Sequence, residues 1–232
     1  LNEGAARPGR HQHSPSAPGF PASAGPLGPE ASHLMSPRVV RFVLKPLVFL
    51  VSLGPAAWLA WAAATGHLSL NPLSDLTNET GVWALRFICL TLLITPLRVL
   101  SGWPEWARLR RMLGLIAFTY ALLHMLCYSA LDMGFEWMDI AKDIAKRPFI
   151  LVGTLTFVIL LALALTSFNA AIRRLGARRW QALHRTVYVA AALAVLHFYW
   201  MRAGKNNWND VWLYGFILAA LLAWRVWHRW RG

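Results

Sequence analysis

The stretch RWQALHRTVYVAAALAVLHFYW, residues 179–200, decides the fold class of this chain. It is rich in Ala, Val and Leu, and a helix of about 20 such residues crosses the hydrocarbon core of a membrane. The stretch also contains two histidines, His184 and His197, one near each end. An imidazole is costly in lipid and is expected to have a partner inside the protein. The stretch therefore predicts a membrane-spanning helix with polar partners in the protein interior.

Six apolar runs of this kind occur along the chain, and 57% of all residues are hydrophobic. The runs cover residues 44–64, 82–100, 111–130, 148–168, 184–202 and 209–228. Lipid offers the backbone no hydrogen-bond partner, so each run is expected to be helical. The expected fold class is an all-α membrane protein, a bundle of six transmembrane helices over residues 38–232.

The first 37 residues have a different composition, rich in Pro, Gly, Ala and Ser. Such a segment cannot bury a core and is predicted to be a disordered tail, residues 1–37. The chain begins with Leu, whereas Met35 stands just before the first apolar run. A natural start at Met35 is therefore an alternative.

Charge predicts how the bundle is oriented. Arginine and lysine gather before the first run, after the second, after the fourth and in the C-terminal tail, while the other loops hold most of the acidic residues. The positive-inside rule then places both termini in the cytoplasm. The net charge of +13 is spread over these short clusters and forms no single patch. Nucleic-acid binding is therefore not expected.

Three histidines lie inside apolar runs: His124 in the third, and His184 and His197 in the fifth. The third and fifth helices should run parallel, which puts His124 and His197 at a similar depth. Two neutral imidazoles at one level can hold a haem iron from both sides, and this arrangement favours electron transfer over oxygen activation. The alternative is that each histidine merely hydrogen-bonds a neighbouring helix.

His184 should lie about 20 Å closer to the cytoplasm than His197, and an ideal helix turns by about 220° between them. Either the helix bends or the two histidines serve different groups. Arg110 and Arg111 stand where a second pair of haem ligands would need a histidine. His184 could bind a second haem or contact a flavin or quinone, and the two arginines could then bind haem propionates or a flavin phosphate. The alternative for the arginines is that they only set the orientation of the chain in the membrane.

One further cation, Arg86, lies about one turn inside the second run. A buried cation is expected to snorkel to the interface or to meet an anion. The alternatives for Arg86 are therefore snorkelling and a contact with a haem propionate or a quinone.

Several short motifs, in this order, resemble one known family. They are LLITPL (residues 92–97), RRMLGL (110–115), LHMLCY (123–128), LGARRWQALHRTVY (175–188) and LHFYW (196–200). The sequence resembles the MsrQ, or YedZ, family of haem-binding subunits, whose membrane domain is ferric-reductase-like. The resemblance covers roughly residues 40–230 and leaves the N-terminal tail unexplained.

The resemblance implies a function and a set of partners. Members of the family sit in the bacterial inner membrane and pass electrons through b-type haem to MsrP, a periplasmic molybdopterin enzyme that reduces methionine sulfoxide in proteins. The matching haem residues are His124, His184 and His197. The expected cofactor is haem b, as one group or two. FMN and a quinone are further candidates from the family, although no residue pattern assigns either.

The interpretation that follows is an electron-transfer subunit with no methionine sulfoxide chemistry of its own. The chain has no dinucleotide-binding glycine motif, so the donor would be a cytoplasmic flavin reductase, a bound flavin or membrane quinol. Two alternatives remain: a proton-coupled transporter with intramembrane histidines, and a stand-alone ferric reductase. No Asp or Glu lies deep in an apolar run, which counts against the transporter. Loops 66–81, 131–147 and 203–208 form the expected docking surface on the outer side.

Overall fold

The computed structural model describes residues 37–203 and 208–231, which are almost entirely helical. The predicted tail, residues 1–37, lies outside the described residues apart from Pro37, and so does most of the 203–208 loop. The helical elements are α2 (Pro37–Val39), the π-helical η1 (Val40–Leu44), α3 (Lys45–Thr65), α4 (Pro72–Ser101), the 3₁₀ turn η2 (Pro104–Trp106), α5 (Ala107–Cys127), the π-helical η3 (Tyr128–Asp132), α6 (Trp137–Lys146), α7 (Pro148–Leu165), α8 (Asn169–Leu175), α9 (Ala177–His184), α10 (Val187–Ala203) and α11 (Asn209–Arg231).

Within these residues, six helices are long and apolar enough to cross a membrane, which confirms the predicted six-helix membrane protein. The spans are Val40–Thr65, Pro72–Ser101, Pro104–Asp132, Pro148–Leu165, Ala177–Ala203 and Asn209–Arg231. The second span begins ten residues before the predicted start at 82, at Pro72. The Asn71 side chain caps it by accepting a hydrogen bond from the backbone N–H of Ser74 at 3.2 Å, and proline is well suited to the first helical turn.

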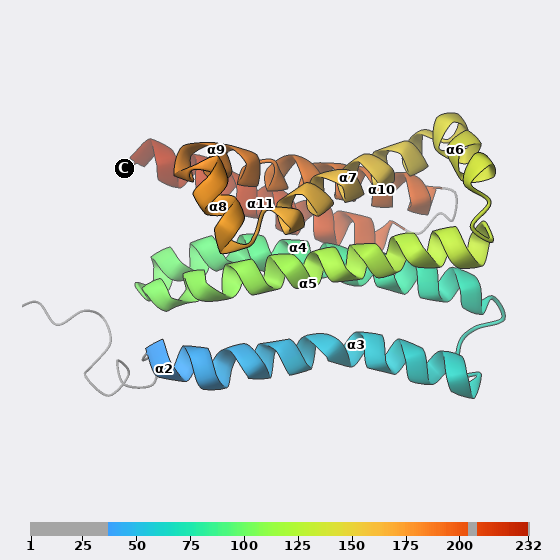
Figure 1. Cartoon of the computed structure of the whole chain (residues 1–232), viewed down its shortest axis with the longest axis horizontal. Helices are drawn as coiled ribbons and strands as arrows, with labels where there is room; N and C mark the ends of the chain where they lie inside the picture. The colour runs from blue at the N-terminus through green and yellow to red at the C-terminus, as the bar shows by residue number, and fades with distance from the viewer. Residues whose placement is uncertain (1–36, 204–207, 232) are drawn as a thin grey trace, which may run out of the picture. The chain divides into compact units, whose positions relative to one another are not determined.

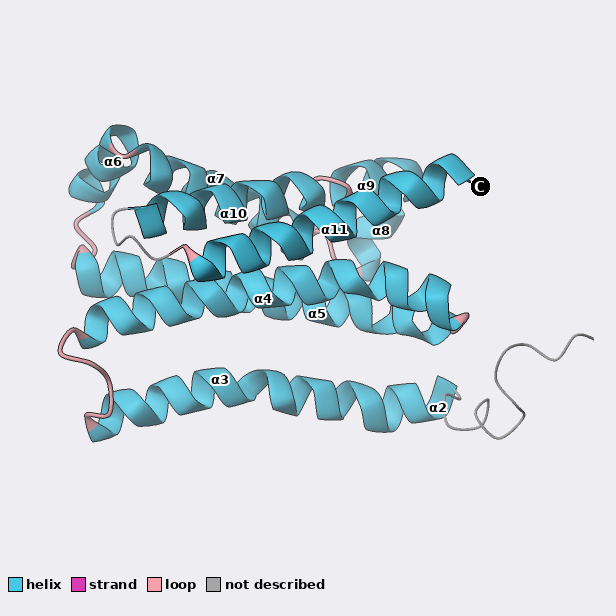
Figure 2. Ribbon diagram, turned by 180° about the vertical axis from the view of Figure 1, so that it is seen from behind, coloured by secondary structure: helices cyan, strands magenta, loops and turns pink. Residues whose placement is uncertain are grey.

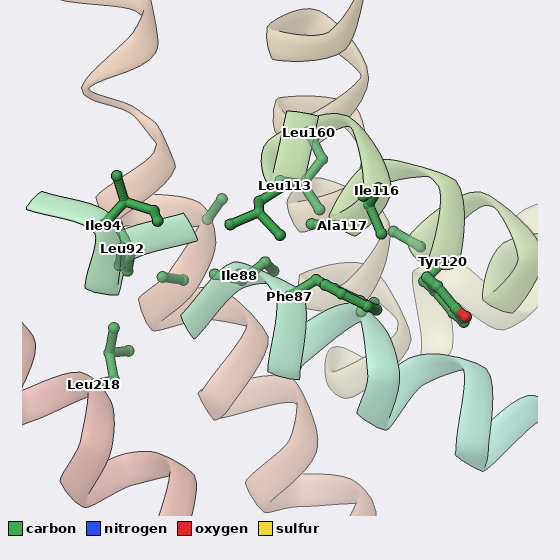
Figure 3. Packing of buried hydrophobic residues seen from close by; sticks show 14 of the residues in the cluster. Phe87, Ile88, Leu92, Ile94, Leu113, Ile116, Ala117, Tyr120, Leu160 and Leu218 are labelled. Atoms are coloured by element: carbon green, nitrogen blue, oxygen red, sulfur yellow. The ribbon is translucent and has the colours of Figure 1, made fainter. Parts of the chain in front are cut away.

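The spans form layers around a central pair. The antiparallel helices α4 and α5 pack together, with α3 on one side and α7, α10 and α11 on the other (Figures 1 and 2). Buried residues of α4 and α5 make most of the main core, and α7, α10 and α11 also contribute, with Leu160 of α7 and Leu218 of α11 visible in Figure 3. We call the end at which α3 ends and α6 lies the α6 end, and the opposite end the arginine-rich end.

Two of the spans contain an internal proline, which disturbs the backbone hydrogen bonds of the helix. In each case a side chain from another helix forms hydrogen bonds with the backbone groups nearby. In α3, the ring of Pro55 disturbs the adjacent turn. The buried Tyr120 hydroxyl accepts from the N–H of Ala56 at 3.1 Å and donates to the carbonyl of Ser52 at 2.6 Å. A side chain inserted into a helical ladder in this way satisfies both groups and ties α3 to α5.

The second interruption is at Pro96 in α4, which leaves the carbonyl of Leu92 without its helical N–H donor. Arg225 of α11 donates to that carbonyl and, at 2.8 Å, to the carbonyl of Leu221. Its guanidinium also lies over the ring of Tyr188, 5.5 Å from the ring centre. The arginine therefore links α4 to α10 and α11 near the arginine-rich end.

The connection over 131–147, named from the sequence as an outer loop, contains the short helix α6. Its apolar residues include Ile140, which is buried, whereas Trp137 and Met138 are exposed. The half-buried Asp143 accepts a hydrogen bond from the Tyr128 hydroxyl at 2.9 Å. Apolar and polar positions alternate with helical period in this short segment, but its ten residues are too few to span a membrane. α6 thus covers the end of the bundle at which the candidate site opens.

Candidate functional site

A cavity of about 490 Å³ lies between α4, α5, α7 and α10, toward the α6 end. This volume is within the usual range for small-molecule and cofactor sites. Its deeper wall is apolar and includes Leu85, Ile88 and Leu160. Its mouth is polar and includes Arg147 and Arg202 together with the carboxylates of Asp132 and Asp143. The cavity therefore suits a ligand with an apolar body and a polar edge.

Two histidines line this cavity from opposite helices, His124 on α5 and His197 on α10. Their ring centres are 6.1 Å apart, and the ring planes are inclined by 73°. Two metal–nitrogen bonds of about 2 Å each, together with the ring radii, place the centres of two trans imidazoles about 6 Å apart. The spacing of these rings matches that requirement.

The same kind of hydrogen bond orients both rings. Nδ1 of His124 lies 2.7 Å from the carbonyl oxygen of Thr77, and Nδ1 of His197 lies 2.7 Å from that of Phe149. A carbonyl can only accept, so each Nδ1 carries the proton. The lone pair is then on Nε2, which is the tautomer a metal-binding histidine needs.

A glycine makes room for each ring. A Cβ atom added to Gly81 would lie 2.9 Å from Nδ1 of His124, and one added to Gly153 would lie 2.8 Å from Cε1 of His197. Gly81 is four residues after Thr77, and Gly153 is four residues after Phe149. In a helix, the side chain at position i+4 lies over the carbonyl of residue i. Only glycine at that position leaves the two carbonyls open to the imidazoles.

Two axial imidazoles alone are too few ligands for a bare metal ion. No group of three or more His, Cys, Asp and Glu side chains able to hold a metal occurs among the residues that the structure describes. A porphyrin supplies four equatorial nitrogens and needs the protein for the axial positions only. The paired rings, their tautomers and the apolar cavity all fit a haem.

His184 lies apart from this pair, 13 residues before His197 in the chain, and the fifth span is not one continuous helix. α9 ends at His184, and α10 begins at Val187. The His184 ring stacks on Trp180, 3.9 Å between ring centres, and its Nδ1 lies 3.2 Å from the Trp180 carbonyl oxygen. Nε2 is buried without a hydrogen-bond partner, and the Leu163 carbonyl lies close enough to act on the ring.

Comparison with known proteins places this architecture in a family. The sequence model described as "Ferric reductase like transmembrane component" matches residues 80–195, which contain His124 and His184. A protein of Polaromonas naphthalenivorans is 59% identical over 186 residues, which cover 80% of this chain and 85% of the relative. Its name is "Protein-methionine-sulfoxide reductase heme-binding subunit MsrQ". The chain belongs to the MsrQ family.

More distant MsrQ proteins match over a similar length. The protein of Herminiimonas arsenicoxydans is 48% identical, with 82% of this chain and 87% of the relative covered. That of Caulobacter vibrioides is 42% identical, with 78% and 85% covered. The family and the six-span, ferric-reductase-like fold expected from the sequence motifs are thereby confirmed.

The arginines singled out from the sequence lie outside the cavity of this MsrQ chain. Arg86 donates from Nε to the Tyr214 hydroxyl at 2.8 Å, and its guanidinium lies 4.4 Å from the centre of the Trp83 ring. Arg111 donates to the Asn169 side chain at 2.9 Å, and Arg110 lies with it near His184. The predicted contacts of these arginines with a cofactor stay predictions.

Four residues that shape the site were not expected there from the sequence: Gly81, Gly153, Arg147 and Arg202. A signal for the glycines existed, because an isolated glycine in a helical run usually has a packing reason. The two arginines gave no such signal. They stand at the ends of predicted spans, where cations are common whatever their role.

Proposed function

We propose that this chain is a membrane electron-transfer subunit that holds b-type haem between His124 and His197. The observation that carries the proposal is the pair of imidazoles 6.1 Å apart, each with its Nδ1 hydrogen-bonded to a backbone carbonyl. The relatives are named heme-binding subunits of a protein-methionine-sulfoxide reductase, which supports the same cofactor and the same system. A haem with two axial histidines supplies one-electron transfer, because neither axial position is open to a substrate.

The direction of transfer is proposed from charge. Loops at the arginine-rich end carry most of the cations, so this end faces the cytoplasm of a bacterial inner membrane, and both termini lie on that side. The α6 end, and with it the His124–His197 cavity, then faces the periplasm. The electron acceptor is a periplasmic molybdopterin subunit of the MsrP type, and the donor is a cytoplasmic flavin reductase or membrane quinol.

A second cavity supports electron exit at the α6 end. It has a volume of about 660 Å³ and lies beside the α3–α4 connection, lined by Asp75 and Glu79 among others. Asn78 and Arg202 line both this cavity and the histidine cavity. The acceptor therefore needs to approach only this face to come close to the edge of the haem.

A visible spectrum tests the proposed cofactor. Protein purified from membranes of cells with ample haem supply should show a Soret band that shifts on reduction with dithionite. Low-spin, six-coordinate spectra are expected in both oxidation states, because two imidazoles give a strong axial field. A colourless protein, or a five-coordinate high-spin spectrum, would contradict the proposal.

We further propose that His184 serves the input of electrons on the cytoplasmic side. Its Nε2 is buried without a hydrogen-bond partner, and Arg110 and Arg111 lie close enough to act on it electrostatically. Nδ1 of His184 faces the Trp180 carbonyl, so Nε2 carries the lone pair and can bind an iron or accept a hydrogen bond. The two arginines can bind an anionic group of the same cofactor, such as a propionate or a phosphate. The candidates are a second haem, FMN and a quinone.

Replacing His184 with alanine separates these candidates. The His124–His197 haem should stay in place, while its reduction by the physiological donor slows by roughly tenfold or more, as is usual when a cofactor contact is lost. Reduction by dithionite should be unchanged. A fall from two haems to one per chain would identify a second haem, and an unchanged count would favour flavin or quinone. A variant with unchanged haem content and an unchanged donor-driven rate would exclude the input role.

A further inference from the structure

We propose that Arg147 and Arg202 bind the two propionate groups of the haem at the mouth of the histidine cavity. The inference rests on the proposed haem and extends it to residues that neither the motifs nor the relatives assign. It also locates the propionates at the α6 end, opposite to Arg110 and Arg111.

Both arginines lie close in the chain to the residues that carry and orient the His197 ring. Arg147 directly precedes α7 and is two residues from Phe149, whose carbonyl accepts the His197 hydrogen bond. Arg202 is five residues after His197, in the last turn of α10. Both side chains line the same cavity as the His197 ring. Their positions relative to an axial ligand are therefore set by short stretches of helix, which are rigid.

Each guanidinium is already held by one carboxylate and keeps further donors. Arg147 Nε lies 2.9 Å from Oδ1 of Asp143, which is itself fixed by the Tyr128 hydroxyl. Nη2 of Arg202 lies 3.8 Å from Oδ2 of Asp210, an ion pair too long for a hydrogen bond, and the guanidinium lies over the Phe198 ring, 5.2 Å from the ring centre. A guanidinium has five N–H donors, and a single carboxylate uses at most two of them well. Both arginines can therefore bind a second carboxylate while the first keeps them in position.

The chemistry of the cavity matches the shape of the ligand. A haem is apolar except for two carboxylates on one edge, and the cavity is mostly apolar, with Arg147 and Arg202 among its polar lining. Two carboxylates, Asp132 and Asp143, also line it, and Asp143 is already paired with Arg147. Arg86, the other cation considered on this side, is engaged with Tyr214 and Trp83 and does not line the cavity. A charged carboxylate binds arginine more strongly than a neutral ester does, because the ester forms only neutral-acceptor hydrogen bonds.

Comparing two porphyrins tests the inference. Arg147→Gln, Arg202→Gln and the double variant should be titrated in lipid nanodiscs with iron protoporphyrin IX and with its dimethyl ester, whose propionates are uncharged. Each single variant should bind native haem about tenfold more weakly than the unsubstituted chain, while its affinity for the ester should change little. The matched control is Lys142→Gln, since Lys142 is an exposed cation on α6 that pairs with Asp139 and does not line the cavity.

A second measurement uses the haem-loaded protein. Haem transfer to excess apomyoglobin should be faster for both arginine variants and unchanged for the lysine control. Equal losses of affinity for both porphyrins would overturn the inference, because the arginines would then act on the fold and not on the propionates. Unchanged affinity for native haem would overturn it too, and would leave the haem proposal standing. Failure of the unsubstituted chain to bind either porphyrin would instead remove both.

Discussion

Replacing His124 or His197 with alanine is expected to remove most of the haem from the purified protein. The two rings lie 6.1 Å apart across the cavity, so either change leaves the iron with a single protein ligand. Loss of a group that only orients a metal ligand typically weakens binding by about 10–100-fold, and loss of the ligand itself should exceed that. The measurement is haem per chain, by pyridine haemochrome assay, on protein purified from cells with ample haem supply.

His228→Ala is the matched control, because His228 stacks on Trp224 near the end of α11 and does not line the cavity. A glycine variant at His197 adds a check on folding, since free imidazole can then enter and restore a six-coordinate spectrum. If both alanine variants kept a full complement of six-coordinate haem, the pairing of His124 with His197 would be refuted.

Gly81→Ala and Gly153→Ala should lower haem content almost as strongly, although neither residue can bind the iron. The added methyl group would come within 2.9 Å of His124 or 2.8 Å of His197, so the ring must shift. A shifted ring loses its Nδ1 hydrogen bond to Thr77 or Phe149, and its Nε2 would be displaced from the position in which it could hold the iron. The expected result is a loss of at least about tenfold in haem affinity, with any residual haem partly high-spin.

Gly114→Ala serves as the control, because its added methyl group would meet only Thr91, at an ordinary 3.8 Å. Alanine also favours a helix over glycine by about 1 kcal/mol, so none of the three variants should lose stability through propensity. Normal haem content and a normal spectrum in Gly81→Ala and Gly153→Ala would show that the rings do not need this close approach.

Some features of the site could be predicted from the sequence alone, because each of them depends only on the position of a residue within its own helix. The depth of His124 and His197 follows from their distance to the span ends, and a rise of about 1.5 Å per residue converts sequence position into depth. The break between His184 and Val187 was only one of two alternatives that the sequence left open. The other was that His184 and His197 serve different groups. No proline or glycine occurs there to mark the break.

The remaining parts of the site depend on contacts between helices. α7 carries no charged residue, so its sequence pattern cannot indicate which face meets the cavity, and hence cannot reveal Gly153 or the Phe149 carbonyl. Arg86 and Arg202 are both cations near span ends in the sequence, but only Arg202 lines the cavity. Helix rotation and packing decide that difference.

The sequence by itself determined the six spans, the charge asymmetry between the two ends and the three intramembrane histidines, because hydropathy and charge are properties of each segment alone. Tertiary structure alone decided which carbonyls orient the imidazoles, which glycines make room for them and which arginines stand at the mouth of the cavity. These relations join residues about 50 positions apart, such as Thr77 with His124 and Phe149 with His197. Neighbours across helices are selected by packing and by kinks such as those at Pro55 and Pro96, and no periodic pattern within one helix encodes them.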